Sequence, residues 1–302
     1  YLPTLKTQTQ IGSCYKYRCP CGFGPGPCQN PQCDLDAADQ LEKAILEYGK
    51  ENIMCFLAEP IVGAALGAAT PGPDYWGRIR EICTRYGVLM IVDEVMVGLG
   101  RTGTNFAIEH WSVDPDIIVL GKGLAAGYQP LGAVLASGKI IRAIQTGSGS
   151  FEHGFTYSGH PVAAAAGLAA ITYLTEKRLV EDVQRRESEF FKAFEPFAEF
   201  DCVGDIRGRG FFMGIEFVKN KTTKEPFEKS VQLSRRICAA AEHAGLLVYP
   251  GSGFIDGERG DHILVAPPLI ISRFEIEELT RRLTSALKRI HEELANPSIM
   301  RP

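Results

Sequence analysis

The sequence contains no block of like charge, and its net charge of −4 over 302 residues is small. Proteins that bind nucleic acids or anionic membranes usually carry a concentrated basic surface, so we expect neither partner. A long hydrophobic run is missing as well: the longest, residues 163–174, contains glycine and threonine and is too short to cross a bilayer. No charged-then-apolar signal peptide opens the chain. These absences predict a soluble, cytoplasmic protein.

Paired Cys-x-x-Cys motifs are also missing, although the chain has nine cysteines. Five of them crowd into one glycine- and proline-rich stretch: Cys14, Cys19, Cys21, Cys28 and Cys33. Structural zinc sites usually present their cysteines in closely spaced pairs, and this stretch does not. An odd number of cysteines without a secretory signal also disfavours a disulfide framework. We therefore predict a metal-free, irregular surface segment with reduced thiols.

Apolar runs of strand length alternate with helical patterns over the first part of the chain. The runs are residues 53–58, 88–92, 117–120 and 131–136, and a helical pattern covers residues 75–86. An earlier helix passes through Leu41 and Ile45, with Asp34 or Asp36 as its expected N-cap. Short all-apolar strands alternating with helices are typical of an α/β fold with a mainly parallel sheet, covered by helices on both faces.

The later part of the chain has a different pattern. Charged amphipathic helices are expected over residues 176–197, 230–244 and 273–294, with shorter strands over residues 210–218, 246–249 and 262–266. The length of the chain and this change of pattern predict two domains. We expect a large domain over residues 1–175 and a smaller C-terminal α+β domain over residues 176–302.

Three polar residues stand at the ends of predicted buried strands: Glu59, Asp93 and Lys122. Ligands of parallel sheets bind beyond the carboxyl ends of the strands, so we expect these residues to share a site. Lys122 lies between two glycines, which lets the backbone approach a bound ring closely. An unpaired buried carboxylate at Asp93 would be costly, and a cationic ring nitrogen would offer it a partner. The ordinary alternatives are a turn or cap residue for Asp93 and a polar strand end for Glu59.

Several motifs place these residues in a wider context. Residues 93–103 read DEVMVGLGRTG and precede the Gly-Lys-Gly of residues 121–123 at a fixed distance. Further on come TYSGHP (residues 156–161), RGRGFF (207–212) and APPL (266–269). In this order they resemble the landmarks of the class III (omega) aminotransferases, which are pyridoxal 5'-phosphate (PLP) enzymes of fold type I. The resemblance covers nearly all of residues 53–290.

The resemblance implies a role for each matching cofactor residue. Lys122 would hold PLP as a Schiff base and would move protons during transamination, and Asp93 would pair with the pyridine nitrogen. Val95 would pack against one face of the ring. Thr156 would donate to the phosphate of the neighbouring subunit's cofactor. This last role implies a homodimer, or a dimer of dimers, with the active site at the subunit interface.

The resemblance also implies substrate contacts. Arg207 would bind a substrate carboxylate, and Glu59 would stand near the cofactor and the substrate. Arg101 is better suited to holding the loop after the signature than to touching substrate. Ala64 and Met96 stand where the ornithine and 4-aminobutyrate branches of the family carry glutamate and glutamine. These two differences favour an amine, β-amino acid or ω-amino compound as donor and pyruvate as acceptor.

Family members also carry an N-terminal phosphate loop and a ring-stacking aromatic residue, and neither is found here. We therefore expect the chain to begin partway through the large domain. Two alternatives share the same motifs: a class III racemase or decarboxylase, and a PLP-free fragment with a structural or regulatory role. Residues 98–103 also spell the GxGxxG pattern of nicotinamide enzymes, but the pattern begins several residues after its strand, so we discount it.

Overall fold

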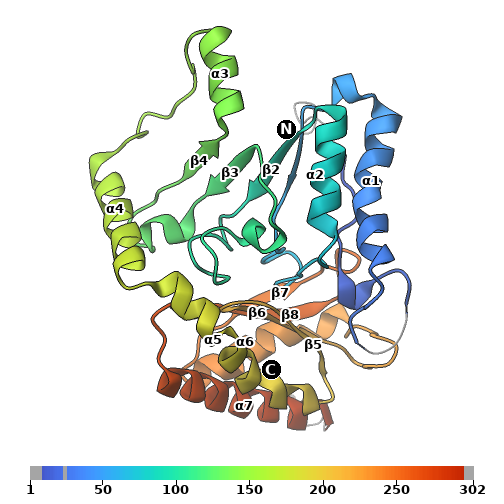
Figure 1. Ribbon diagram of the computed structural model, residues 1–302. Helices are drawn as coiled ribbons and strands as arrows, with labels where there is room; N and C mark the ends of the chain where they lie inside the picture. The colour runs from blue at the N-terminus through green and yellow to red at the C-terminus, as the bar shows by residue number, and fades with distance from the viewer. Residues whose placement is uncertain (1–8, 23–25, 296–302) are drawn as a thin grey trace.

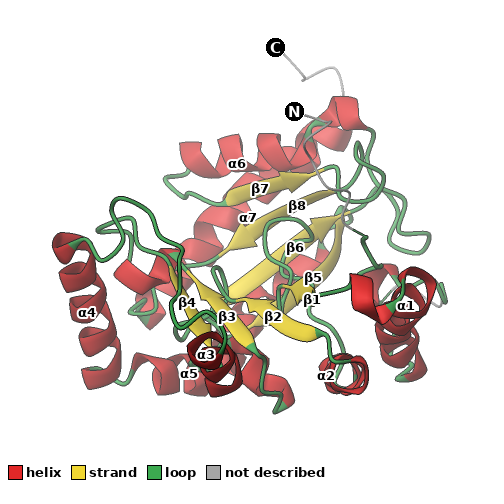
Figure 2. Cartoon of the chain, turned by 90° about the horizontal axis from the view of Figure 1, so that it is seen from above, coloured by secondary structure: helices red, strands yellow, loops and turns green. Residues whose placement is uncertain are grey.

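The computed structural model describes residues 9–22 and 26–295. Two four-stranded sheets form within these residues, one above the other in Figure 1, each with helices packed against it. Seen from above in Figure 2, helices surround both sheets. Among the described helices, none is both long enough and apolar enough to cross a membrane.

The first sheet confirms the predicted α/β class. Its strands, in the order β1-β2-β3-β4, are β1 (Cys55–Ala58), β2 (Leu89–Asp93), β3 (Ile117–Leu120) and β4 (Ala133–Ala136). The first three strands are parallel, and β4 runs antiparallel to β3. The sheet is therefore mainly parallel, with an antiparallel edge strand.

Two helices pack against this sheet: α1 (Gln32–Tyr48) and α2 (Tyr75–Tyr86). A buried apolar core joins them to the strands through Ile45, Ile79 and Met90, which are at most 1% exposed. Trp76, also in this core, donates its indole N–H to the carbonyl of Pro60 at 3.1 Å. This bond fixes the chain just beyond the end of β1.

Helix α1 begins without the predicted cap. It starts at Gln32, after Pro31, and neither Asp34 nor Asp36 caps it through its side chain. Asp34 instead lies in the first turn, fully buried, with its Oδ1 2.6 Å from Lys16 Nζ. The capping prediction was wrong because a buried carboxylate requires a charged partner, which outweighs the smaller gain of a cap.

The described residues cover the first sheet incompletely, unlike the predicted layer on both faces. Leu57, Val134 and Leu135 are 59%, 66% and 44% exposed. After β4 the chain leaves the sheet through α3 (Gly138–Thr146), an extended loop and α4 (Pro161–Glu176). Figure 1 shows this excursion projecting from the body of the molecule.

The second sheet is antiparallel throughout and has the order β5-β6-β8-β7. Its strands are β5 (Val203–Arg209), β6 (Phe212–Phe217), β7 (Tyr249–Ser252) and β8 (Asp261–Val265). Strand β5 was not predicted because its sequence, VGDIRGR, lacks an apolar run, and its pairing with β6 makes it a strand. The two sheets have separate apolar cores, and the division of the chain into two domains at residue 175 stays a prediction.

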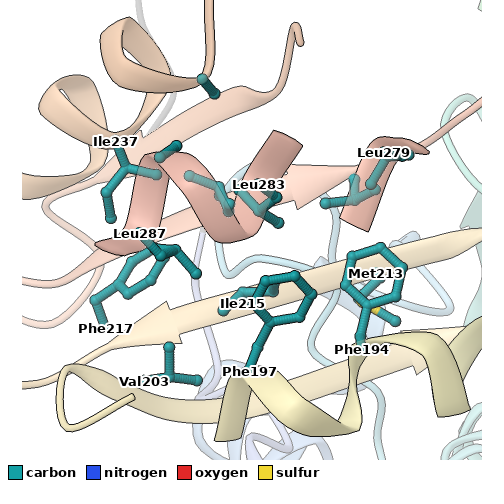
Figure 3. Close-up of a cluster of buried hydrophobic side chains, with 14 of the residues drawn as sticks. Phe194, Phe197, Val203, Met213, Ile215, Phe217, Ile237, Leu279, Leu283 and Leu287 are labelled. Carbon is teal, nitrogen blue, oxygen red and sulfur yellow. The ribbon is translucent and has the colours of Figure 1, made fainter. Parts of the chain in front are cut away.

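Three helices pack on the second sheet: α5 (Leu179–Phe194), α6 (Leu233–His243) and α7 (Arg273–Ala295). Figure 3 shows their shared core, in which Phe194, Ile215 and Leu283 come from a helix, a strand and another helix. Short 3₁₀ helices complete the described elements: η2 (Lys16–Arg18), η3 (Lys50–Asn52), η4 (Ala107–Trp111), η5 (Lys122–Ala125), η6 (Glu195–Glu199) and η7 (Lys229–Val231).

His262 in β8 predicts a pH-dependent stability. The side chain is fully buried, and burial together with the charge of Arg207 lowers the pKa of the imidazole to about 4, from an ordinary value of 6.5. Between these values the unfolded chain binds a proton that the folded chain does not, so stability rises with pH across this window and is lost as pH falls. We expect this group to account for at most about 3 kcal/mol of the change.

The measurement is urea unfolding of the parent and of His262→Gln at about pH 5 and about pH 7. The variant should show a smaller difference in unfolding free energy between the two conditions. An equal difference in both proteins would assign the pH dependence to other groups.

Candidate active site

Glu59, Asp93 and Lys122 meet at the carboxyl edge of the first sheet. Ala58 pairs with Val92, so Glu59 follows β1 beside the end of β2. Asp93 is the last residue of β2, and Lys122 comes two residues after β3. Burial raises the pKa of the Glu59 carboxyl, the charge of Asp93 raises it further, and Lys122 lowers it. The three groups therefore lie within electrostatic reach of one another.

The backbone fixes both carboxylates of this site. Glu59 Oε2 accepts a hydrogen bond from the N–H of Gly63 at 2.9 Å, and Asp93 Oδ1 accepts one from the N–H of Val95 at 2.9 Å. The second oxygen of Asp93, Oδ2, has no hydrogen-bond partner within residues 9–22 and 26–295. It is an oriented acceptor at the edge of the sheet.

Lys122 has a strained backbone and an exposed side chain. Its φ of 42° is in the left-handed region, which costs a residue with a side chain about 1–2 kcal/mol. Such strain concentrates at functional sites. Gly121 before it lies against Val95, whose side chain would be 3.3 Å from an added Cβ. The lysine is thus presented on a tight turn that packs against the Asp93 segment.

Glu94, the neighbour of Asp93, has a structural role that was not predicted from the sequence. It is 1% exposed, and its two oxygens accept the N–H groups of Ala107 and Ile108 at 2.9 Å each. Burial raises the pKa of this carboxyl to about 7, although the two hydrogen bonds oppose the shift. Glu94 therefore holds the start of η4, and both of its oxygens are already occupied.

Arg101 holds the loop after the signature, as expected from the sequence, and its partners lie beside strands of the second sheet. Its Nη1 donates to the carbonyls of Phe211 and Pro267 at 3.1 and 2.5 Å, and burial lowers its pKa to about 10. Gly210 allows the close approach, because a Cβ there would lie 2.6 Å from the backbone of Thr102. Two of the resembling motifs therefore touch through their backbones.

Arg207 lies in a buried ion cluster beside the loop that follows β1. Its Nη1 is 2.8 Å from Glu216 Oε2 and 3.0 Å from Asp205 Oδ2. Its Nη2 donates to the carbonyl of Leu66 at 2.6 Å, and the guanidinium stacks over the ring of Tyr15 at 4.8 Å. Two carboxylates already balance the positive charge of Arg207, so a substrate carboxylate would have to compete with them.

Glu216, at the centre of this cluster, was not predicted from the sequence. It is fully buried in β6 and also bonds Arg18 Nε at 2.6 Å and the hydroxyl of Tyr15. One signal was available in the sequence: Glu216 is the single carboxylate within the apolar run of residues 211–218. Such a group requires a charged partner.

Thr156 lies apart from the other predicted site residues. It belongs to the exposed stretch 151–160, between α3 and α4. Val95, in contrast, lies beside Gly121 and next to Asp93 in the chain. The structure thus brings together Glu59, Asp93, Val95 and Lys122, while the cofactor role of Thr156 stays a prediction.

Known proteins resemble this chain over most of its length. The family model for aminotransferase class-III matches residues 24–287. An uncharacterised aminotransferase of Bacillus subtilis, YodT, is 41% identical over 259 residues, which cover 85% of this chain and 58% of the relative. The putrescine–pyruvate aminotransferase of Pseudomonas aeruginosa is 40% identical over 264 residues, covering 86% of this chain and 55% of that protein.

Solved structures agree with these matches. A PLP-bound amine transaminase from an uncultivated Pseudomonas species is 35% identical, with a TM-score of 0.83, over 92% of this chain and 61% of that one. The chain therefore spans little more than half the length of its relatives, between 55% and 61% in these examples. Because the family match covers most of the chain, this protein belongs to the class III aminotransferases, which are PLP-dependent enzymes of fold type I.

Proposed function

We propose that the protein is a PLP-dependent transaminase that moves an amino group from an amine, β-amino acid or ω-amino compound to a small keto acid, with pyruvate preferred. The observation that carries this proposal is the meeting of Glu59, Asp93 and Lys122 at one edge of a parallel sheet. The similarity to a putrescine–pyruvate aminotransferase supports the pairing of an amine with a keto acid.

The side chains at this edge fit the cofactor. Lys122 offers an exposed amine for covalent attachment, and Asp93 offers a free carboxylate oxygen for a cationic ring nitrogen. Val95 supplies an apolar surface next to Gly121 for the ring to pack against. The bound cofactor supplies an electron-withdrawing ring that stabilises negative charge on the substrate carbon.

Three residues of this chain would hold the cofactor, move protons and contact the substrate. Asp93, held by the N–H of Val95, keeps the facing ring nitrogen protonated through its negative charge. Lys122 acts as the general acid and base that removes and returns the proton at the substrate carbon. Glu59 lies between these groups and the loop that contacts Arg207, where it would touch both cofactor and substrate.

We also propose a cytoplasmic homodimer in which the projecting segment reaches the partner subunit. Large apolar side chains surround Thr156: Phe151, Phe155 and Tyr157 are 71%, 77% and 80% exposed. A second subunit would bury these rings and receive the Thr156 hydroxyl at its cofactor. Sedimentation of the full-length protein, with and without Phe155→Ser, tests this assembly.

The decisive measurement is the absorbance spectrum of the full-length protein mixed with PLP. A transaminase should bind PLP, change its spectrum on addition of an amine, and return to the first spectrum with a keto acid. A racemase or decarboxylase would release an inverted or decarboxylated product instead of an amino acid made from the keto acid. No spectral change with PLP would favour a non-catalytic role.

The acceptor is predicted to be pyruvate rather than 2-oxoglutarate. In the 2-oxoglutarate branches of the family, a glutamate in this loop pairs with a movable arginine. The loop around Ala64 lacks that glutamate, so the site is less suited to accepting the distal carboxylate of 2-oxoglutarate. Single-turnover reaction of the aminated enzyme should be at least about tenfold faster with pyruvate, a difference of about 1.4 kcal/mol. A faster reaction with 2-oxoglutarate would overturn this choice and leave the PLP assignment intact.

Arg207 provides a second test of the keto-acid site. If it binds the acceptor carboxylate, Arg207→Lys should raise the KM for pyruvate at least about tenfold and leave the half-reaction of a donor without a carboxylate nearly unchanged. If Arg207 only balances Glu216 and Asp205, both half-reactions should change together, along with thermal stability. Arg209→Lys, the neighbouring arginine with a more exposed side chain, is the matched control.

A further inference from the structure

The N-terminal cysteines gather in the folded chain. Four of their Sγ atoms all lie within 4.8 Å of one another, and we call this group the four-cysteine cluster: Cys19, Cys21, Cys28 and Cys33. Cys14 lies outside it, with its Sγ 3.6 Å from Asp34 Oδ1. The prediction of a metal-free segment was based on poor ligand spacing in the sequence, and that reason does not hold for the folded chain.

The four sulfurs lie close enough together for one tetrahedral ion to bind all of them. Four sulfurs around zinc, each about 2.3 Å from the metal, lie about 3.8 Å from one another. The sulfurs of Cys21 and Cys28 are 3.1 Å apart, and those of Cys28 and Cys33 are 3.7 Å apart. A disulfide requires a separation of about 2.05 Å. Two separate disulfides would also not require all four sulfurs to lie within 4.8 Å of one another.

The backbone explains how irregular spacing produces a compact cluster. The N–H of Gly22 donates to the carbonyl of Cys19 at 3.0 Å, which closes a tight turn around Cys21. The N–H of Cys28 donates to the carbonyl of Lys16 at 2.8 Å and returns the loop to its start. Cys33 follows in the first turn of α1.

We propose that the four-cysteine cluster binds one zinc ion through four thiolates. Four protein ligands leave no open position, which is the pattern of structural rather than catalytic zinc. Each thiol that is protonated releases its proton when the metal binds, and no oxidation or reduction takes place. The site is distinct from the edge of the first sheet that holds Lys122.

The ion holds a segment that joins the two domains. Arg18, directly before the first ligand, pairs with Glu216 of β6 at 2.6 Å. Lys224 of the small domain donates to the carbonyls of Tyr17 and Gly26 at 2.6 and 3.0 Å, on either side of the turn. Loss of the ion loosens this segment, so the peptide bond after Arg18 becomes accessible to trypsin.

The test is the metal content of the purified full-length protein, with coordination measured by X-ray absorption. We expect about one zinc per chain, surrounded by four sulfurs at about 2.3 Å. Cys28→Ser should lower bound zinc at least about tenfold. Cys14→Ser is the matched control, because Cys14 belongs to the same segment but not to the cluster, and it should keep the metal. Trypsin should cleave after Arg18 only once a chelator has removed the zinc.

The parent protein alone is sufficient to reject the proposal. Less than about 0.1 zinc per chain after reconstitution, a different metal in the cluster, or a disulfide-linked peptide of Cys21 and Cys28 would each overturn it. Loss of zinc from Cys14→Ser equal to that from Cys28→Ser would overturn the choice of ligands. None of these measurements depends on transaminase activity, so they test the zinc site independently of the proposed function.

Discussion

Lys122→Ala is expected to abolish transamination by the full-length enzyme. The variant lacks both the amine that holds the cofactor and the group that moves the proton at the substrate carbon. General acid–base catalysis alone typically contributes 10²–10⁴-fold, so we expect turnover to fall at least about 10³-fold. The measurement is steady-state formation of the new amino acid, together with cofactor content, because PLP can still bind without its covalent link.

Three further experiments test the assignment of Lys122. Lys288→Ala removes an exposed lysine from α7, away from the first sheet, and should leave activity unchanged. Borohydride reduction of the PLP-loaded parent, followed by peptide mapping, should place the label on Lys122. Label on another lysine would end this assignment. Because Lys122 has a positive φ, Lys122→Gly should also relieve strain and give a stable, inactive protein.

Asp93→Asn is expected to slow the half-reaction with an amine donor at least about 100-fold, a loss of about 2.7 kcal/mol in transition-state stabilisation. The amide keeps the shape of the side chain and can still accept the hydrogen bond from the Val95 N–H. It removes only the negative charge that keeps the facing ring nitrogen protonated. Stopped-flow absorbance after mixing the PLP form with an amine measures the step.

The isosteric change separates the loss of charge at Asp93 from a loss of folding. The thermal midpoint of Asp93→Asn should stay close to that of the parent, since the local hydrogen bond is kept. Asp93→Glu keeps the charge but moves it, so its rate should lie between those of the parent and of the amide. A near-normal rate in Asp93→Asn would mean that the carboxylate is only a turn residue.

The meeting of three polar side chains at the edge of the first sheet was predictable because it depends on local patterns. An apolar run that ends in a polar residue specifies a buried strand and its exit, and parallel strands place their exits at one edge. Glu59, Asp93 and Lys122 follow from this rule without any long-range information. The structure adds the hydrogen bonds that orient the two carboxylates and the strained backbone of Lys122.

The surroundings of Arg207 could not be predicted in the same way. Its partners Asp205 and Glu216 depend on the pairing of β5 with β6, and β5 has no apolar pattern of its own. Tyr15 and Arg18 reach this cluster from the far end of the chain. Propensity and periodicity describe neighbours in sequence, so a charge cluster assembled from three distant segments leaves no local signal.

The α/β class, the family and the residues at the ends of the parallel strands could all be predicted from the amino-acid sequence, because each is specified by a short segment. The folded chain was needed to show which charges face Arg207, which residue pairs with Asp34 and how the N-terminal cysteines are arranged. In each of these cases a loop or an unpatterned strand folds back on a distant segment. Burial and ion pairing then select a geometry that the spacing of residues does not encode.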